Sequence, residues 1–159
     1  MRALITGVTG QDGLYLSELL LSKGYDVYGL VRGQNNPKMD LLRQAVPDVK
    51  VLTGDLTDLS SLIRAFSQSQ PTEVYNLGAI SFVAYSWENA HLTSDVTAKG
   101  VLNVLEATRL YAGDDLSKVR FYQASARRCS ARCSTYRSAR TRSCGRGRRT
   151  ASPRSSVTT

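Results

Sequence analysis

The fold is decided by residues 2–13, RALITGVTGQDG. The apolar run at residues 2–6 predicts a buried β-strand, and a helical pattern from Leu14 to Lys23 follows the glycines directly. In such a strand–turn–helix unit, glycines allow a tight turn, close approach of the backbone to a pyrophosphate, and packing of the helix on the strand. The helix N-terminus then faces the phosphates. We therefore expect dinucleotide contacts from Gly7, Thr9, Gly10, Gln11, Asp12 and Gly13; a simple turn is the alternative.

A second apolar run, from Tyr25 to Val31, ends at Arg32. A unit that binds NAD is expected to carry an acid about 20 residues past the glycine loop, where it binds the ribose hydroxyls. Arg32 stands there instead. A guanidinium can pair with a 2′-phosphate through two hydrogen bonds, whereas a carboxylate repels it. The expected cofactor is therefore NADP; an ordinary solvated loop arginine is the alternative.

The same alternation of strand and helix continues along the chain. Further strands are expected at residues 49–53, 72–77 and 119–123, with helical stretches near residues 39–45 and 59–67 between them. Strands that alternate with helices indicate an α/β protein. We predict a Rossmann-type, doubly wound parallel sheet that stops after its fifth strand.

The ends of the third and fourth strands supply further candidates for cofactor binding. Asp55 follows the third strand, where it can accept a hydrogen bond from an adenine amino group or cap the next helix. Small residues after the fourth strand leave room for the ribose and phosphates. Beside Asp55, the cofactor contacts expected from these two segments are Leu56, Leu77, Gly78, Ala79 and Ser81.

One long helix is expected from about Glu88 to Tyr111. Apolar residues recur there at helical spacing, and we expect Leu102 and Leu105 to lie in the core. Trp87 and His91, near the start of this stretch, are interpreted as packing and cap residues; a role in the chemistry is the alternative.

The composition changes abruptly after Ser125. Residues 1–125 hold all 13 acidic residues and 11 of the 21 basic ones, so their net charge is −2. Residues 126–159 hold the other 10 basic residues, all of them Arg, with no acid and with all 3 Cys. A segment so poor in apolar residues cannot offset its ordering entropy. We therefore expect an incomplete NADP-binding domain at 1–125 and a disordered Arg/Ser-rich tail at 126–159.

This split also governs which partners can be expected. The net charge of +8 comes from the tail, so it does not indicate that the mildly acidic first part binds nucleic acid. The three Cys, at positions 129, 133 and 144, lack a fourth ligand nearby, so no metal site is expected. The sequence shows neither a signal-peptide core nor a run of 18 apolar residues. We expect a cytoplasmic protein without a membrane partner.

Five segments carry a resemblance to a known family: GVTGQDG, LVRG, GDLTDL, YNLGAISFVAYSWE and RFYQAS. Together they resemble the GDP-mannose 4,6-dehydratases, which are extended short-chain dehydrogenases/reductases, over residues 2–125. The resemblance implies conversion of GDP-mannose to GDP-4-keto-6-deoxymannose and water, with NADP as a recycled hydride carrier, in a homo-oligomer. It adds Ser86 as a weak candidate for substrate contact. A remnant of another nucleotide-sugar dehydratase or epimerase, or a cofactor-binding module without chemistry, is the alternative.

The resemblance also implies catalytic groups that the printed residues lack. The family pattern after the fifth strand is A-S-[ST]-S-E, followed downstream by Y-x-x-x-K. Here Ala126, Arg127 and Arg128 follow Ser125, and Tyr136 has an arginine four residues on. No catalytic residue is therefore assigned, and we expect the chain as printed to be inactive.

A reading of the tail one base out of frame restores this pattern. With Arg127 as CGG, Arg128 as AGA and Cys129 as TGT, the shifted reading begins E-M-F-G, and permitted synonymous codons continue it as K-V-Q-H-V-P-Q-x-E-N-T-L-L-W-P-R-S-P-Y-G-V-A-K-V-F-G-H-Y. One A restored before a GCT codon for Ala126 turns A-S-A-R-R into A-S-S-S-E. We therefore hypothesise a single-base deletion after the Ser125 codon.

Overall fold

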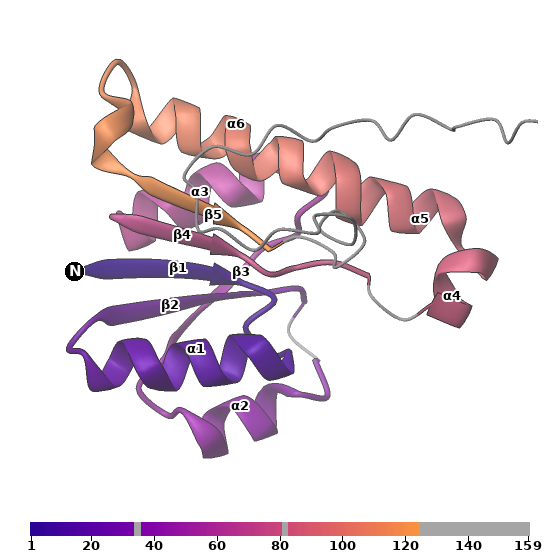
Figure 1. Cartoon of the computed structure of the whole chain (residues 1–159), viewed down its shortest axis with the longest axis horizontal. Helices are drawn as coiled ribbons and strands as arrows, with labels where there is room; N and C mark the ends of the chain where they lie inside the picture. The colour runs from indigo at the N-terminus through magenta and orange to yellow at the C-terminus, as the bar shows by residue number, and fades with distance from the viewer. Residues whose placement is uncertain (34–35, 81–82, 125–159) are drawn as a thin grey trace, which may run out of the picture. The chain divides into compact units, whose positions relative to one another are not determined.

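The computed structural model describes residues 1–33, 36–80 and 83–124. Five parallel strands form one sheet in the order β3-β2-β1-β4-β5. Figure 1 shows β1 in the middle of the sheet. The strands are β1 (Arg2–Thr6), β2 (Asp26–Val31), β3 (Lys50–Thr53), β4 (Glu73–Asn76) and β5 (Arg120–Gln123). This confirms the Rossmann-type fold class.

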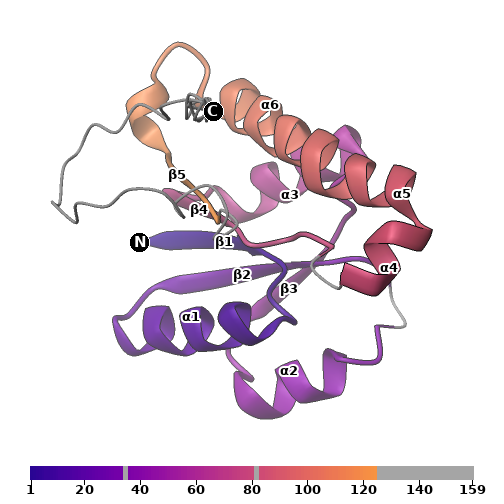
Figure 2. The same ribbon diagram turned by 45° about the vertical axis from the view of Figure 1, so that its right-hand side comes forward.

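Helices cover both faces of the sheet. The α1 and α2 helices lie on one side, and α3 and α6 lie on the other, in both ribbon views (Figures 1 and 2). The helical segments are α1 (Gln11–Ser22), α2 (Met39–Ala45), α3 (Leu59–Ser69), α4 (Val83–Glu88), α5 (Ala90–Ser94), a π-helical turn η1 (Asp95–Lys99), α6 (Gly100–Ala112) and a 3₁₀ turn η2 (Leu116–Lys118). The chain therefore winds away from β1 in both directions, as a doubly wound sheet requires.

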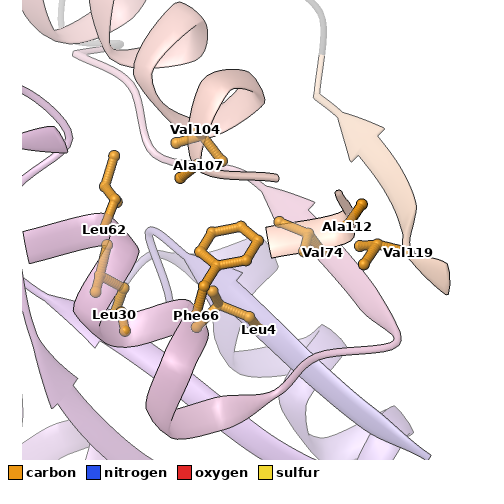
Figure 3. Packing of buried hydrophobic residues seen from close by; sticks show 10 residues of the cluster. Leu4, Leu30, Leu62, Phe66, Val74, Val104, Ala107, Ala112 and Val119 are labelled. Atoms are coloured by element: carbon orange, nitrogen blue, oxygen red, sulfur yellow. The ribbon is translucent and has the colours of Figure 1, made fainter. Parts of the chain in front are cut away.

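The central strand β1 separates two apolar cores. Successive side chains of a strand point to opposite faces, so Leu4 packs towards α3 and α6 while Ala3 and Ile5 pack towards α1 and α2. All three are fully buried, which is why this strand reads as a continuous apolar run. Figure 3 shows the first core, which consists of Leu4, Leu30, Leu62, Ala65, Phe66, Val74, Val104, Ala107, Ala112 and Val119.

The long helix expected from about Glu88 to Tyr111 is present as the uninterrupted run of α5, η1 and α6, but the core assigned to it is wrong. Residues 83–112 form α4, α5, η1 and α6 in succession. Leu102 is 65% exposed and Leu105 is 42% exposed, whereas Val104 and Ala107 are buried against α3 and the sheet. The helix has apolar residues on two faces, and its valine and alanine face, rather than the leucine face, packs on α3.

The roles expected for Trp87 and His91 are also not met. Trp87 is 82% exposed, so it does not serve as a packing residue among the described parts of the chain. The residue at the N-cap of α5 is Asn89, and His91 lies inside that helix. The expectations of a disordered tail and of Cys that bind no metal both fall outside the described residues.

Residues 1–124 form one compact unit. Within the described parts of the chain, no helix is long and apolar enough to cross a membrane.

Candidate nucleotide-binding site

The candidate site lies where the carboxyl ends of β1 and β4 meet. These strands are neighbours in the sheet, with Thr6 opposite Asn76. The chain leaves β1 for α1 on one face and leaves β4 for the helices of the other face (Figure 1). Parallel α/β sheets bind ligands at such a reversal of strand order, because the two departing loops open a crevice between them.

Two glycines of the first loop are required by close packing. Gly7 has φ +69°, and a Cβ placed on it would lie 2.8 Å from the Gly78 nitrogen. A Cβ on Gly13 would lie 2.5 Å from the Gly7 carbonyl oxygen and 2.7 Å from Val8 Cα. Any side chain at either position therefore collides with backbone, so the loop can lie against β4 and begin α1 only with glycine there. Gly10, at the N-cap of α1, closes the turn with a hydrogen bond from its N–H to the Gly7 carbonyl, 2.9 Å.

Buried polar side chains tie the ends of three strands together. Thr6 donates a hydrogen bond from Oγ1 to Asn76 Oδ1 and accepts one at 3.0 Å from the Gly78 N–H. Asn76 Nδ2 donates to Gln123 Oε1 at 2.7 Å, which extends the chain of bonds to β5. Thr6 is 1% exposed and Asn76 0%, so the bond between them is buried, whereas the bonds to Gly78 and Gln123 are partly buried. They hold the loop after β4 against the loop after β1.

Two adjoining hollows open beside these loops. The first, of about 480 Å³, is named here the loop hollow. The second, of about 210 Å³, is named the Arg32 hollow. Predicted residues that line the loop hollow are Gly7, Thr9, Gly10, Gln11, Asp12, Gly13, Leu77, Gly78 and Ala79. Those that line the Arg32 hollow are Gly7, Thr9, Arg32, Asp55, Leu56, Gly78 and Ala79. Segments predicted separately, after four different strands, are thus brought together.

The structure decides against a helix-capping role for Asp55. The N-cap of α3 is Asp58, whose side chain accepts a hydrogen bond from the Ser60 N–H at 3.0 Å. Asp55 instead uses Oδ1 to accept from the N–H and the hydroxyl of Thr57, at 2.9 and 2.8 Å. The carboxylate therefore sits in a turn at the wall of the Arg32 hollow. This position leaves the adenine interpretation open.

Two candidates cannot be placed in the site. Ser81 lies outside the described residues. Ser86 belongs to α4, but its side chain lies outside what the structure describes. Neither is therefore connected to the hollows by the structure.

The sequence reasoning missed two polar residues of the segment before α2. Lys38 lines the loop hollow, and Asn36 lines the Arg32 hollow. Lys38 also borders a wider hollow of about 750 Å³ between α1 and α2, which shares Thr9 and Gln11 with the loop hollow. No motif marks this segment; the only available signal was a cation and an amide a few residues after β2.

Tyr75, at the end of β4, is not placed to act as a base in the hollows. Burial, reinforced by a hydrogen bond to Glu73 of 2.7 Å, raises the pKa of Tyr75 to about 12. A tyrosine that abstracts protons needs the opposite shift. Tyr75 packs on the core under α1 and α2 and lines neither hollow. In the part of the chain that the structure describes, no group of His, Cys, Asp and Glu could hold a metal ion.

Comparison with known proteins shows which family this arrangement represents. The family model described as GDP-mannose 4,6 dehydratase matches residues 4–129. The chain belongs to the GDP-mannose 4,6-dehydratase family. It is 49% identical to the GDP-mannose 4,6-dehydratase of Yersinia enterocolitica over 131 residues, which cover 78% of this chain and 35% of the relative. The human GDP-mannose 4,6 dehydratase is 41% identical, over 77% of this chain and 35% of the relative. The chain thus spans about a third of the length of the relatives it matches.

Solved structures of related enzymes have the same fold. The UDP-glucose 4-epimerase of Thermus thermophilus, in a complex with NAD, matches with a TM-score of 0.62 and 35% identity, over 70% of this chain and 35% of that one. A UDP-glucose-4-epimerase of Stenotrophomonas maltophila, with bound NAD, matches with a TM-score of 0.68 over 85% of this chain and 40% of that one. Its identity is 16%, so it supports the fold alone. The chain thus has the fold of these epimerases.

Proposed function

We propose that residues 1–124 bind NADP at the two adjoining hollows. The observation that carries this proposal is the glycine cradle, where a Cβ at Gly7 or Gly13 would occupy space within 3 Å of backbone. A pyrophosphate fits such a cradle because backbone N–H groups and the start of α1 can face it without intervening side chains. The Thermus thermophilus structure, solved with NAD, supports a nicotinamide dinucleotide as the class of ligand.

Arg32 supports the choice of NADP over NAD. It lines the same hollow as Asp55 and Leu56, at the end of β2, where the adenosine ribose would lie. Its guanidinium suits a 2′-phosphate. Asp55 uses Oδ1 within its own turn, and among the described residues Oδ2 has no hydrogen-bond partner, so we assign Oδ2 to the adenine amino group.

We further propose that this is the cofactor-binding part of a dehydratase that acts on GDP-mannose. The cofactor supplies a hydride acceptor and donor in that reaction. The protein must supply groups that remove and return protons at the sugar, and the family places them after the fifth strand. The printed residues after Ser125 lack the glutamate and the Tyr–Lys pair. The chain as printed should therefore bind the cofactor without dehydrating GDP-mannose.

Fluorescence titration of the 159-residue chain with NADPH and with NADH tests the cofactor proposal. We expect NADPH to bind more tightly, and Arg32→Met to raise the NADPH dissociation constant by about tenfold, or roughly 1.4 kcal/mol, without affecting NADH. Arg43→Met is the matched control, because Arg43 lies in α2 and lines neither hollow. Equal losses for both nucleotides in Arg32→Met, or no binding by the unsubstituted chain, would contradict the proposal.

A further inference from the structure

The site has two cations, and they border different hollows. Arg32 lines the Arg32 hollow and is absent from the wall of the loop hollow. Lys38 lines the loop hollow and is absent from the wall of the Arg32 hollow. The loop hollow contains the glycine loop, whereas the Arg32 hollow contains Asp55 and Leu56. The two charges therefore lie at different parts of the site.

We infer that Lys38 binds the pyrophosphate of the dinucleotide, whereas Arg32 binds the 2′-phosphate. This inference rests on the proposed NADP binding and deepens it. A pyrophosphate in the loop hollow brings two negative charges next to Asp12, which lines the same hollow. The other ionisable side chain on that wall, among the described residues, is Lys38. Its ammonium offsets the repulsion from Asp12.

The backbone around Lys38 holds the residue at this wall. Its N–H donates to Asn36 Oδ1 at 3.0 Å, and its carbonyl accepts from the Leu42 N–H at 3.1 Å. The Met39 N–H also donates to the Asn36 carbonyl, at 2.9 Å. These bonds use the main chain of Lys38 and leave its side chain exposed. A change of its side chain alone therefore leaves the turn before α2 intact.

The Lys38 ammonium also forms no ion pair with a carboxylate of the described residues. Among the described residues, the ion pairs within 4.0 Å join Lys50 to Asp26, Arg109 to Glu106 and Arg120 to Glu73. A flexible, strongly hydrated ammonium suits a pyrophosphate as a mobile point charge. Lys38 thus adds the positive side chain that the glycine loop itself, with its backbone N–H groups and neutral Thr9 and Gln11, does not contain.

The test compares Lys38→Met, Arg32→Met and Lys23→Met in the full chain, titrated with NADPH and with NADH. Methionine keeps most of the side-chain length and removes the charge. Lys23 is the matched control, because it is exposed, follows α1 and lines neither hollow, yet its replacement changes the net charge equally. NADPH and NADH both carry the pyrophosphate, but of these two only NADPH carries the 2′-phosphate.

We expect Lys38→Met to raise the dissociation constants of NADPH and NADH by the same factor, about fivefold, because both lose one exposed ion pair. Lys23→Met should change neither constant. Unchanged affinities in Lys38→Met, or a loss confined to NADPH, would overturn the assignment of Lys38 while leaving NADP binding in place. Failure of the unsubstituted chain to bind either nucleotide would overturn the proposed function and this inference together.

Discussion

The carboxyl ends of β1 and β5 lie at the same edge of the sheet. The segments that follow these strands, called here the two exits, differ in the functions that their residues can support. After β1, the positions of Gly7 and Gly13 are fixed by contacts that no other residue could make. After β5, Ala124 still lines the loop hollow beside those glycines, but the printed residues that follow lack the family's acid and its Tyr–Lys pair. In the proposed function, cofactor binding and proton transfer depend on different strands, so we expect one to persist where the other is lost.

The largest effect is expected from replacing the exit after β5. A chimera that joins residues 1–125 to the remainder of the Yersinia enterocolitica relative should dehydrate GDP-mannose at least about a thousandfold faster than the 159-residue chain, because it regains its acid and base groups. Formation of the 4-keto sugar nucleotide measures the rate. A chimera that folds and binds NADPH but shows no turnover would mean that the defect also lies before residue 125.

A smaller, but still large, loss of stability and of NADPH affinity is expected from a substitution in the exit after β1. Gly13→Ala places a methyl group against the Gly7 carbonyl and Val8. We expect the free energy of unfolding in urea to fall by about 2–3 kcal/mol and the NADPH dissociation constant to rise by about tenfold. Gly24→Ala is the control: Gly24 has a positive φ, +75°, but no atom lies within 4 Å of the added Cβ. It should cost about 1 kcal/mol of stability and leave NADPH affinity unchanged; equal affinity losses would contradict the packing argument.

A smaller change in stability is expected when the side-chain hydrogen bonds that join the ends of β1, β4 and β5 are lost. Asn76→Ala leaves Thr6 and Gln123 without their partner, and we expect unfolding to become easier by about 1–3 kcal/mol. Ser69→Ala is a matched control, because Ser69 is also 0% exposed but donates only to the Ala65 carbonyl within α3. Its loss should cost at most about 0.5 kcal/mol. Urea denaturation measures the free energy of unfolding of both variants. Similar losses in the two would contradict a stabilising role for the hydrogen bonds between the strand ends.

The exit after β1 could be predicted from the sequence because its constraints are local. A strand, three glycines and a helix within about twenty residues leave little freedom, and Arg32 follows at a fixed distance. The same holds for the apolar run of β1, which is buried on both faces.

Other parts depended on tertiary packing that the sequence pattern does not contain. Asp55 and Asp58 both precede α3 closely, and only the path of the chain shows that Asp58 caps it. The leucine face of α6 is as apolar as the face that packs, so Leu102 could not be recognised as exposed. Lys38 carries no motif, and it meets the glycine loop only because α2 folds back beside α1 (Figure 2).

The coding DNA after the Ser125 codon tests most directly the claim that the two exits differ by a shifted reading frame. We predict the bases GCTCGGAGATGTTCGG from Ala126 onward. This series encodes the printed Ala-Arg-Arg-Cys-Ser in one frame and the hidden Ser-Glu-Met-Phe-Gly in another, and an A before it completes Ser-Ser-Glu-Met-Phe-Gly. Other synonymous codons at Arg127, Arg128 or Cys129, such as CGT for Arg128, would destroy the hidden glutamate or methionine. Such codons would contradict a shifted reading frame and would indicate that the tail is encoded as printed.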